Sequence, residues 1–212
     1  MKPLNREQLS WVDETLSSLS LEQRVAQLLQ PKIDRPSDVD FLLKTMEKIP
    51  FGGLFVWGAP REAHLERIGR LQAASRIPIV VAADLENGPG YIVHDTARFP
   101  DTLAVGAADS EELAYTMGKA AALDGRASGI HWTFAPVVDV NVNPDNPIAN
   151  TRCLGDNPER IGKLAAAIIR GMQDHGLAAC AKHFPGDGID ERDQHISTSV
   201  NPLSLEEWKT VS

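Results

Sequence analysis

Cysteine is scarce in this sequence, which has two cysteines among its 212 residues. Cys153 and Cys180 each lie in a mostly apolar segment, and neither has a second cysteine at the spacing of metal ligands. Cysteines so placed predict two buried free thiols rather than a disulfide framework or a zinc site.

Long apolar runs are also lacking. No stretch approaches the ~20 apolar residues that a membrane-spanning helix requires. The opening residues, MKPLNREQLSWVDETL, do not contain the ~7–15-residue apolar core of a secretory signal. We therefore expect a cytoplasmic protein with no membrane partner.

Positive charge is in deficit, with 21 Lys and Arg against 29 Asp and Glu and a formal net charge of -8. No local cluster of Lys or Arg offsets this balance. An acidic surface gains nothing electrostatically from a phosphate backbone or an anionic lipid surface. Nucleic acid and anionic membranes are therefore not expected partners.

The sequence does contain a regular alternation of strand-like and helical segments. Four compact apolar runs have the length and composition of buried strands, namely residues 51–57, 77–83, 130–140 and 177–184. Helices are predicted over residues 38–48, 61–75 and 110–127, and over a segment that begins near Pro158 and runs through His175. Two further helices are predicted after the capping boxes that begin at Ser20 and Ser204. Strands alternating with helices predict a parallel sheet with helices on its faces.

Capping residues set the expected helix ends. Asp109 is expected to cap the helix over 110–127. Asp156 or Asn157, followed by Pro158, is expected to open the helix that Gly176 ends.

Two α/β architectures fit this alternation, a doubly wound open sheet and a (β/α)₈ barrel. Long polar loops follow several of the strands, which is where barrel enzymes carry their active sites. No glycine-rich phosphate fingerprint follows any strand, as a nucleotide-binding doubly wound sheet would require. With four or five strands, residues 1–212 predict one domain, an incomplete (β/α)₈ TIM-type barrel that stops before it closes.

The loop after the last predicted strand carries the densest chemistry. Lys182 and His183 lie at the strand end, and both can donate hydrogen bonds to sugar hydroxyls. Further along the loop, Asp193 precedes His195 by two residues, and a carboxylate beside an imidazole holds one tautomer for proton transfer. A solvent-facing loop in which His195 merely pairs with an acid is the alternative at this point.

Two earlier loops carry further candidates. Arg152 ends a loop rich in Asn, Pro and Asp, and its fork of donors can clamp a hydroxyl pair. Asp84 opens the segment DLENG after the second predicted strand and can accept hydrogen bonds from hydroxyls. An ordinary structural arginine and an ordinary turn-forming aspartate remain the alternatives.

In this order along the chain, the motifs resemble glycoside hydrolase family 3. The resemblance is carried by KHFPG and the following Asp-x-His, by FAPVVDVN…NP…R before them, and by D-x-E-x-G after a buried strand. It covers nearly the whole chain, from SLEQRVAQLLQ to the last residue. The Asp-x-His pair looks like the acid/base dyad of the β-N-acetylhexosaminidase (N-acetylglucosaminidase) branch.

This resemblance implies a retaining hydrolase that removes non-reducing terminal β-linked N-acetylglucosamine, with no cofactor. It implies that His195 is the general acid/base and that Asp193 orients it. The residues it implies for sugar binding are Asp84, Arg152, Lys182 and His183.

The sequence departs from the family pattern in two places. The branch usually reads GHG where this chain has Gly186-Asp187-Gly188, which bears on substrate choice. The nucleophilic Asp of the family lies on a strand well downstream of the dyad, and no Asp of this chain occupies that place. We therefore expect the isolated chain to hydrolyse glycosides poorly and to associate through its open barrel edge.

Several functions remain as alternatives. One is a β-glucosidase or β-xylosidase of the same family, and another is a non-catalytic carbohydrate-binding fragment. A histidine acid/base leaves the site less negative than a carboxylic acid would, which makes phosphorolysis a minor alternative. A metal-dependent hydrolase would draw its ligands from one loop: His183, Asp187, Asp190, Asp193 and His195.

Overall fold

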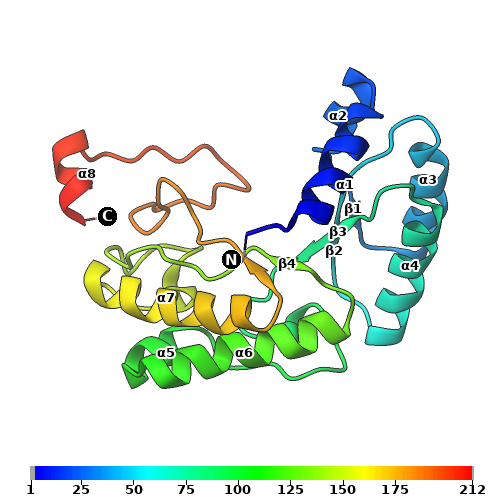
Figure 1. The fold of residues 1–212 in the computed structure, drawn as a ribbon. Helices are drawn as coiled ribbons and strands as arrows, with labels where there is room; N and C mark the ends of the chain where they lie inside the picture. Colours follow the sequence, from blue (N-terminus) through cyan, green and yellow to red (C-terminus); the bar gives the residue numbers. More distant parts are fainter. Residues whose placement is uncertain (1–2, 212) are drawn as a thin grey trace.

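The computed structural model describes residues 3–211, which fold around one parallel five-stranded sheet (Figure 1). The strands pair in chain order, β1-β2-β3-β4-β5. Their bounds are β1 (Lys32–Ile33), β2 (Gly53–Val56), β3 (Val80–Ala83), β4 (Trp132–Thr133) and β5 (Ala178–Ala179). The predicted α/β class with parallel strands is confirmed, and the open sheet corresponds to successive units of an incomplete barrel.

Helices connect the successive strands. The α-helices are α1 (Arg6–Ser17), α2 (Leu21–Ala26), α3 (Pro36–Met46), α4 (Arg61–Ala74), α5 (Leu103–Ala108), α6 (Glu111–Ala127), α7 (Pro158–Asp174) and α8 (Leu205–Val211). Two short 3₁₀ turns, η1 (Pro89–Tyr91) and η2 (Asn150–Arg152), lie in the loops after β3 and β4. In the described part of the chain, none of these helices combines the length and the apolar character needed to cross a bilayer.

The helix caps agree with the sequence except at one position. Of the two predicted caps of α7, Asp156 and Asn157, the structure uses Asn157, whose side chain accepts a hydrogen bond from the backbone N–H of Arg160, and Pro158 is the first residue of the helix. The prediction that Asp109 caps the following helix is wrong, because Ser110 accepts from the N–H of Leu113 instead. Asp109 ends α5 in a left-handed conformation, with φ of 49°.

Alternation along the strands directs one set of side chains into the main core. Leu54 and Val56 of β2 are fully buried, whereas Phe55 between them is half-buried and points to the other face of the sheet. Phe55 packs there beside Phe134, with ring centroids 5.8 Å apart. The larger core on the helical side includes Ile68 from α4 and Leu164 from α7.

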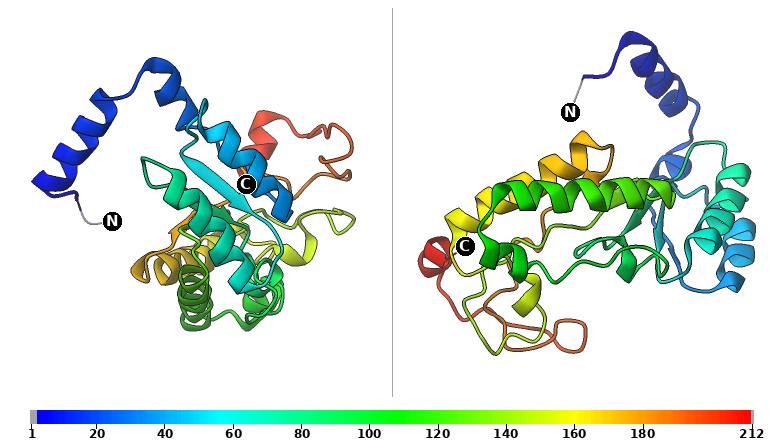
Figure 2. Two further views of the ribbon diagram at one scale, coloured as in Figure 1. Left: turned by 90° about the vertical axis from the view of Figure 1, so that its right-hand side faces the viewer. Right: turned by 90° about the horizontal axis from the view of Figure 1, so that it is seen from below.

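Helices α6 and α7 lie side by side (Figures 1 and 2) because glycine lets their backbones approach closely. A Cβ atom on Gly171 would lie 2.2 Å from the carbonyl oxygen of Tyr115, which no side chain can occupy. A Cβ atom on Gly118 would lie 2.1 Å from the carbonyl oxygen of Ile168. The two glycines therefore set the spacing of this helix pair.

Two α-helices and one strand were not predicted from the sequence: α1, α5 and β1. Helix α1 has a complete capping box at Asn5 but buries none of its residues, and it projects from the rest of the molecule (Figure 2). Strand β1 has two residues, too few to give a pattern.

Both cysteines are free thiols, but the prediction that both are buried is wrong for one of them. Cys153 is fully buried, and burial raises the pKa of its thiol to about 12. Cys180 is half-buried because it lies just beyond the end of β5.

Candidate active site

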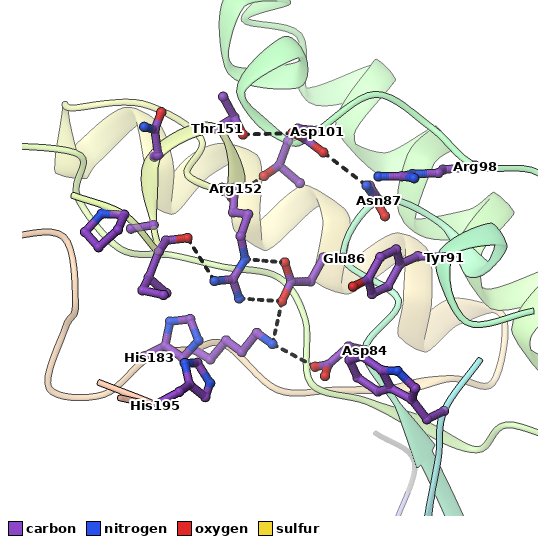
Figure 3. Close-up of a pocket in the computed structure, with 17 residues that line it drawn as sticks. Asp84, Glu86, Asn87, Tyr91, Arg98, Asp101, Thr151, Arg152, His183 and His195 are labelled. Carbon is purple, nitrogen blue, oxygen red and sulfur yellow. Dashed lines mark hydrogen bonds and ion pairs between the residues drawn. The ribbon is translucent and has the colours of Figure 1, made fainter. Parts of the chain in front are cut away.

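The polar loops at the carboxyl ends of β3, β4 and β5 enclose a cavity of about 700 Å³ (Figure 3). Parallel strands place these ends at one edge of the sheet, so residues far apart in the chain meet there. The volume is within the range of small-molecule binding pockets, about 300–1,000 Å³. The predicted residues that line it are Asp84, Arg152, Lys182, His183 and His195.

A network of ion pairs forms the floor of this cavity. The Lys182 ammonium lies 2.7 Å from Asp84 Oδ1 and 2.6 Å from Glu86 Oε1. Arg152 donates from Nε and Nη2 to the two oxygens of Glu86, both at 2.8 Å. Glu86 therefore lies between the two cations. Figure 3 shows its bonds to Arg152, with Asp84 nearby.

The charged state of this network is favoured by its own contacts. Burial raises the pKa of Glu86, but the hydrogen bonds and charges of Arg152 and Lys182 outweigh burial and hold that pKa below its usual range. The hydrogen bond to Glu86 raises the pKa of Arg152 further above its ordinary value. Glu86 and Arg152 thus remain ionised at neutral pH, and their charges offset one another.

A buried carboxylate, Asp139, fixes the start of the loop that follows β5. Asp139, whose side chain is 0% exposed, lies 2.6 Å from Nδ1 of His183, and its other oxygen accepts from the backbone N–H of Asp187 at 2.6 Å. Burial raises the pKa of Asp139, but these hydrogen bonds outweigh burial and lower it overall. His183 therefore uses Nδ1 to hold the loop and keeps Nε2 for the cavity.

The predicted acid/base pair is formed further along the same loop. His195 Nδ1 lies 2.7 Å from Asp193 Oδ1, and the same oxygen accepts from the backbone N–H of His195 at 2.8 Å. The backbone hydrogen bond from His195, and to a lesser degree the bond to its side chain, lower the pKa of Asp193. The imidazole is 80% exposed at the mouth of the cavity, so it can exchange protons with solvent.

The opposite wall combines aromatic and polar side chains. Trp57 and Tyr91 meet edge to face with ring centroids 5.8 Å apart, and the Arg98 guanidinium lies 5.4 Å from the Tyr91 ring centroid. Asp101 accepts hydrogen bonds from Asn87 at 3.1 Å and from Thr151 at 2.8 Å (Figure 3). This wall offers apolar faces, to which sugar rings bind well, beside fixed polar groups.

The structure thus gathers all six predicted residues at one end of the sheet, five in the cavity wall and Asp193 behind His195. Two residues of comparable importance were missed, Glu86 and Asp139. Glu86 follows Asp84 by two residues in the quoted segment DLENG, and Asp139 directly follows the predicted strand, so position alone could have identified both.

The residues proposed for a metal site are occupied with other contacts. Gln194 donates to both Asp187 and Asp190, and Asp139 binds His183. Among residues 3–211, no group of three or more His, Cys, Asp or Glu side chains is arranged to hold a metal ion. The metal-dependent alternative therefore has no ligand set in the part of the chain that the structure describes.

Known proteins resemble this chain over most of its length. Residues 20–212 match the Glycosyl hydrolase family 3 N terminal domain. A beta-N-acetylglucosaminidase/beta-glucosidase of Cellulomonas fimi is 34% identical over 205 residues, which is 97% of this chain and 36% of that protein.

Two solved structures also superpose on most of this chain. A beta-glucoside phosphorylase bound to 2FGlc superposes with a TM-score of 0.91 at 39% identity, over 100% of this chain and 38% of that one. A family 3 beta-N-acetylglucosaminidase from Paenibacillus sp. str. FPU-7 gives a TM-score of 0.84 at 29% identity, over 92% of this chain and 38% of that one. The chain therefore spans little more than a third of the length of these three relatives.

Proposed function

Because this chain belongs to glycoside hydrolase family 3, we propose that it supplies the sugar-binding and acid/base part of a retaining glycosidase site. The substrate proposed is a non-reducing terminal, β-linked N-acetylglucosamine. One observation carries this proposal: His195, whose Nδ1 contacts Asp193, lines the same cavity as the Lys182–Asp84 pair, although Asp84 lies on a different loop from Lys182 and His195.

The acid/base step follows from the orientation of His195. Asp193 occupies Nδ1 of the imidazole, so Nε2 is the nitrogen that gives a proton to the leaving oxygen and later takes one from water. Asp193 also accepts from the backbone N–H of His195, so the same carboxylate contacts both the ring and the backbone of the histidine. The cavity floor meanwhile binds sugar hydroxyls through Lys182, Arg152 and Asp84.

Retention of configuration also needs a nucleophilic carboxylate. The carboxylates that line the cavity are engaged: Asp84 with Lys182, Glu86 with both cations, and Asp101 with Asn87 and Thr151. None is therefore a free nucleophile. We propose that the nucleophile lies outside these 212 residues and that the chain alone turns over poorly.

Phosphorolysis is the second candidate function. The similarity to a beta-glucoside phosphorylase, at 39% identity over the whole chain, favours it. A histidine acid/base supports it chemically, because the site then carries one less negative charge to repel phosphate. The two functions differ only in the acceptor, which is water or phosphate.

The experiment is a release assay with nitrophenyl β-N-acetylglucosaminide, run with this chain and with a version extended through further strands. We expect turnover from the extended version alone and its loss in His195→Ala. Turnover by the 212-residue chain would overturn the assignment of the nucleophile, and no turnover of this substrate by either version would overturn the substrate.

The same assay separates the alternatives. A faster rate on nitrophenyl β-glucoside or β-xyloside would favour those branches of the family. Formation of a sugar 1-phosphate when phosphate is added would favour phosphorolysis over hydrolysis. Sugar binding without turnover in the extended version would favour a carbohydrate-binding role.

We further propose a cytoplasmic location and self-association of the isolated chain. The two free thiols fit a reducing compartment, and cell fractionation tests the location. In the described residues, β1 and β5 each have one unpaired edge, and unpaired edges promote association. A monodisperse monomer in sedimentation velocity would contradict the association.

A further inference from the structure

Glu86 is the most heavily shared group of the cavity, and neither the motifs nor the comparisons give it a role. One of its oxygens contacts both cations, at 2.6 Å from Lys182 Nζ and 2.8 Å from Arg152 Nη2. Its second oxygen accepts from Arg152 Nε at 2.8 Å. The Glu86 side chain is 15% exposed, so water weakens these contacts little.

The donors that remain define what the cations can offer to a ligand. Arg152 spends Nε and one Nη2 proton on Glu86 and one Nη1 proton on the carbonyl of Ile148 at 2.9 Å. Lys182 spends two of its three protons on Asp84 and Glu86. Each cation thus keeps fixed, directed donors, because the paired protons prevent rotation of the guanidinium and the ammonium.

The charges of the floor also balance. Asp84 and Glu86 carry two negative charges against the two positive charges of Lys182 and Arg152. A neutral sugar ring gains hydrogen bonds from such a floor. An anionic ligand gains no net attraction, because each cation already has a carboxylate partner.

We propose that Glu86 is a positioning and specificity-determining residue for this site. It fixes the orientation of Lys182 and Arg152, and it neutralises the floor so that a neutral sugar ring is accepted and an oxyanion is refused there. The claim that Glu86 orients the cations for a sugar is the positioning part, and it rests on the proposed function. The claim that Glu86 neutralises the floor is the charge part, and it rests on the ion pairs alone.

The first experiment measures sulfate binding to the 212-residue chain by isothermal titration calorimetry. Glu86→Gln leaves two cations against one carboxylate, so sulfate should bind about tenfold more tightly than to the unchanged chain. The matched control is Glu111→Gln, which removes an exposed carboxylate 3.4 Å from Arg170 and should leave sulfate binding unchanged. A folded Glu86→Gln chain that binds sulfate no better would overturn the charge part.

A second variant separates charge from position. Glu86→Asp keeps the negative charge but shortens the side chain, so sulfate binding should stay at its original level. Binding of N-acetylglucosamine to the same chain, followed by NMR, should weaken about tenfold in both Glu86 variants, because the cations lose their fixed orientation. Unchanged sugar binding in both variants would overturn the positioning part.

The outcomes also distinguish this proposal from the proposed function. If the unchanged chain binds no N-acetylglucosamine, the substrate assignment fails, and the sulfate titration still decides whether Glu86 neutralises the floor. If the sugar binds and neither variant changes its affinity or that of sulfate, Glu86 has no role in the site and the proposed function stands.

Discussion

Asp139 and His183 are 44 residues apart in the sequence, and in the structure Asp139 Oδ2 lies 2.6 Å from His183 Nδ1. The same carboxylate holds the backbone of Asp187, so it joins the loop after β4 to the loop after β5. One buried side chain thereby fixes the start of the loop that carries the proposed acid/base pair, Asp193 and His195.

Asp139→Asn should lower the free energy of unfolding by about 1.5–3 kcal/mol, because hydrogen bonds to a buried ionised group are lost. Asp40→Asn, at an exposed ion pair with Arg70, is the control and should change stability by less than about 0.5 kcal/mol. Urea denaturation at neutral pH checks both values, and equal effects in the two variants would contradict the anchoring role.

The stability that Asp139 contributes should depend on pH. The pKa of Asp139 is lowered in the folded chain, so its contribution is complete above the unfolded value of about 3.9. The contribution is lost as the pH falls through the lowered folded-state pKa. The stability difference between the unchanged chain and Asp139→Asn should therefore hold from pH 7 to about 4 and shrink below it, as denaturation at several pH values would show.

His195→Ala should reduce the turnover that we propose for the extended protein by about 10²–10⁴-fold, because the proposed proton donor is removed. Asp193→Asn should reduce turnover less, since the imidazole remains but loses the carboxylate that orients it. His94→Gln is the control, because His94 lies outside the cavity and exposed. Steady-state kinetics check this order, and full activity in His195→Ala would remove it from the mechanism.

Gly171→Ala and Gly162→Ala form a matched pair on helix α7. The first places a Cβ atom 2.2 Å from the carbonyl oxygen of Tyr115 and should destabilise the chain by about 1–3 kcal/mol through overpacking. The second meets nothing within 4 Å and should stabilise it by about 0.5–1 kcal/mol, because alanine favours the helix. Thermal unfolding of both variants checks the opposite signs, and a shared sign would show that helix contact does not decide the effect.

His131 should make stability depend on pH near neutrality. Its Nδ1 accepts the backbone N–H of Val81 at 3.1 Å, and burial lowers its pKa. Below about pH 6.5 the unfolded chain takes up a proton that the folded chain resists, so the free energy of unfolding falls as the pH falls. His131→Gln keeps an acceptor without this titration and should show a shallower slope between pH 7 and 5 in urea denaturation.

The sequence predicted the parts of the fold that depend on local pattern. Residues 51–57 and 77–83 contain strands β2 and β3. The cap of α7 could be predicted as Asp156 or Asn157, because a capping side chain and Pro158 act within one turn, and the structure selects Asn157. The error at Asp109 arose because two adjacent residues can both cap, and only the left-handed end of α5 decides between them. Helix α1 was missed although its sequence carries a helical pattern: Asn5 and Gln8 form a capping box, and Leu9, Val12 and Leu16 recur at helical spacing.

The site, like the fold, has features that depend on local pattern and features that depend on tertiary contacts. The residues with unusual local context, such as Lys182 and His195, could be chosen from motifs alone. The partnership of Lys182 with Asp84 spans 98 positions, and the sharing of Glu86 between two cations depends on how three loops converge. No local pattern reports such convergence, because it follows from the order and register of the strands.

That strand order has a consequence for how the chain is made. Each strand pairs with the one that precedes it in the sequence, so no early segment has to wait for a distant partner. During synthesis from the N-terminus, every new unit can dock on an edge that has already formed. The sheet of these residues can thus assemble stepwise on the ribosome, and Asp84 is synthesised before the loop that brings His195 to the same cavity.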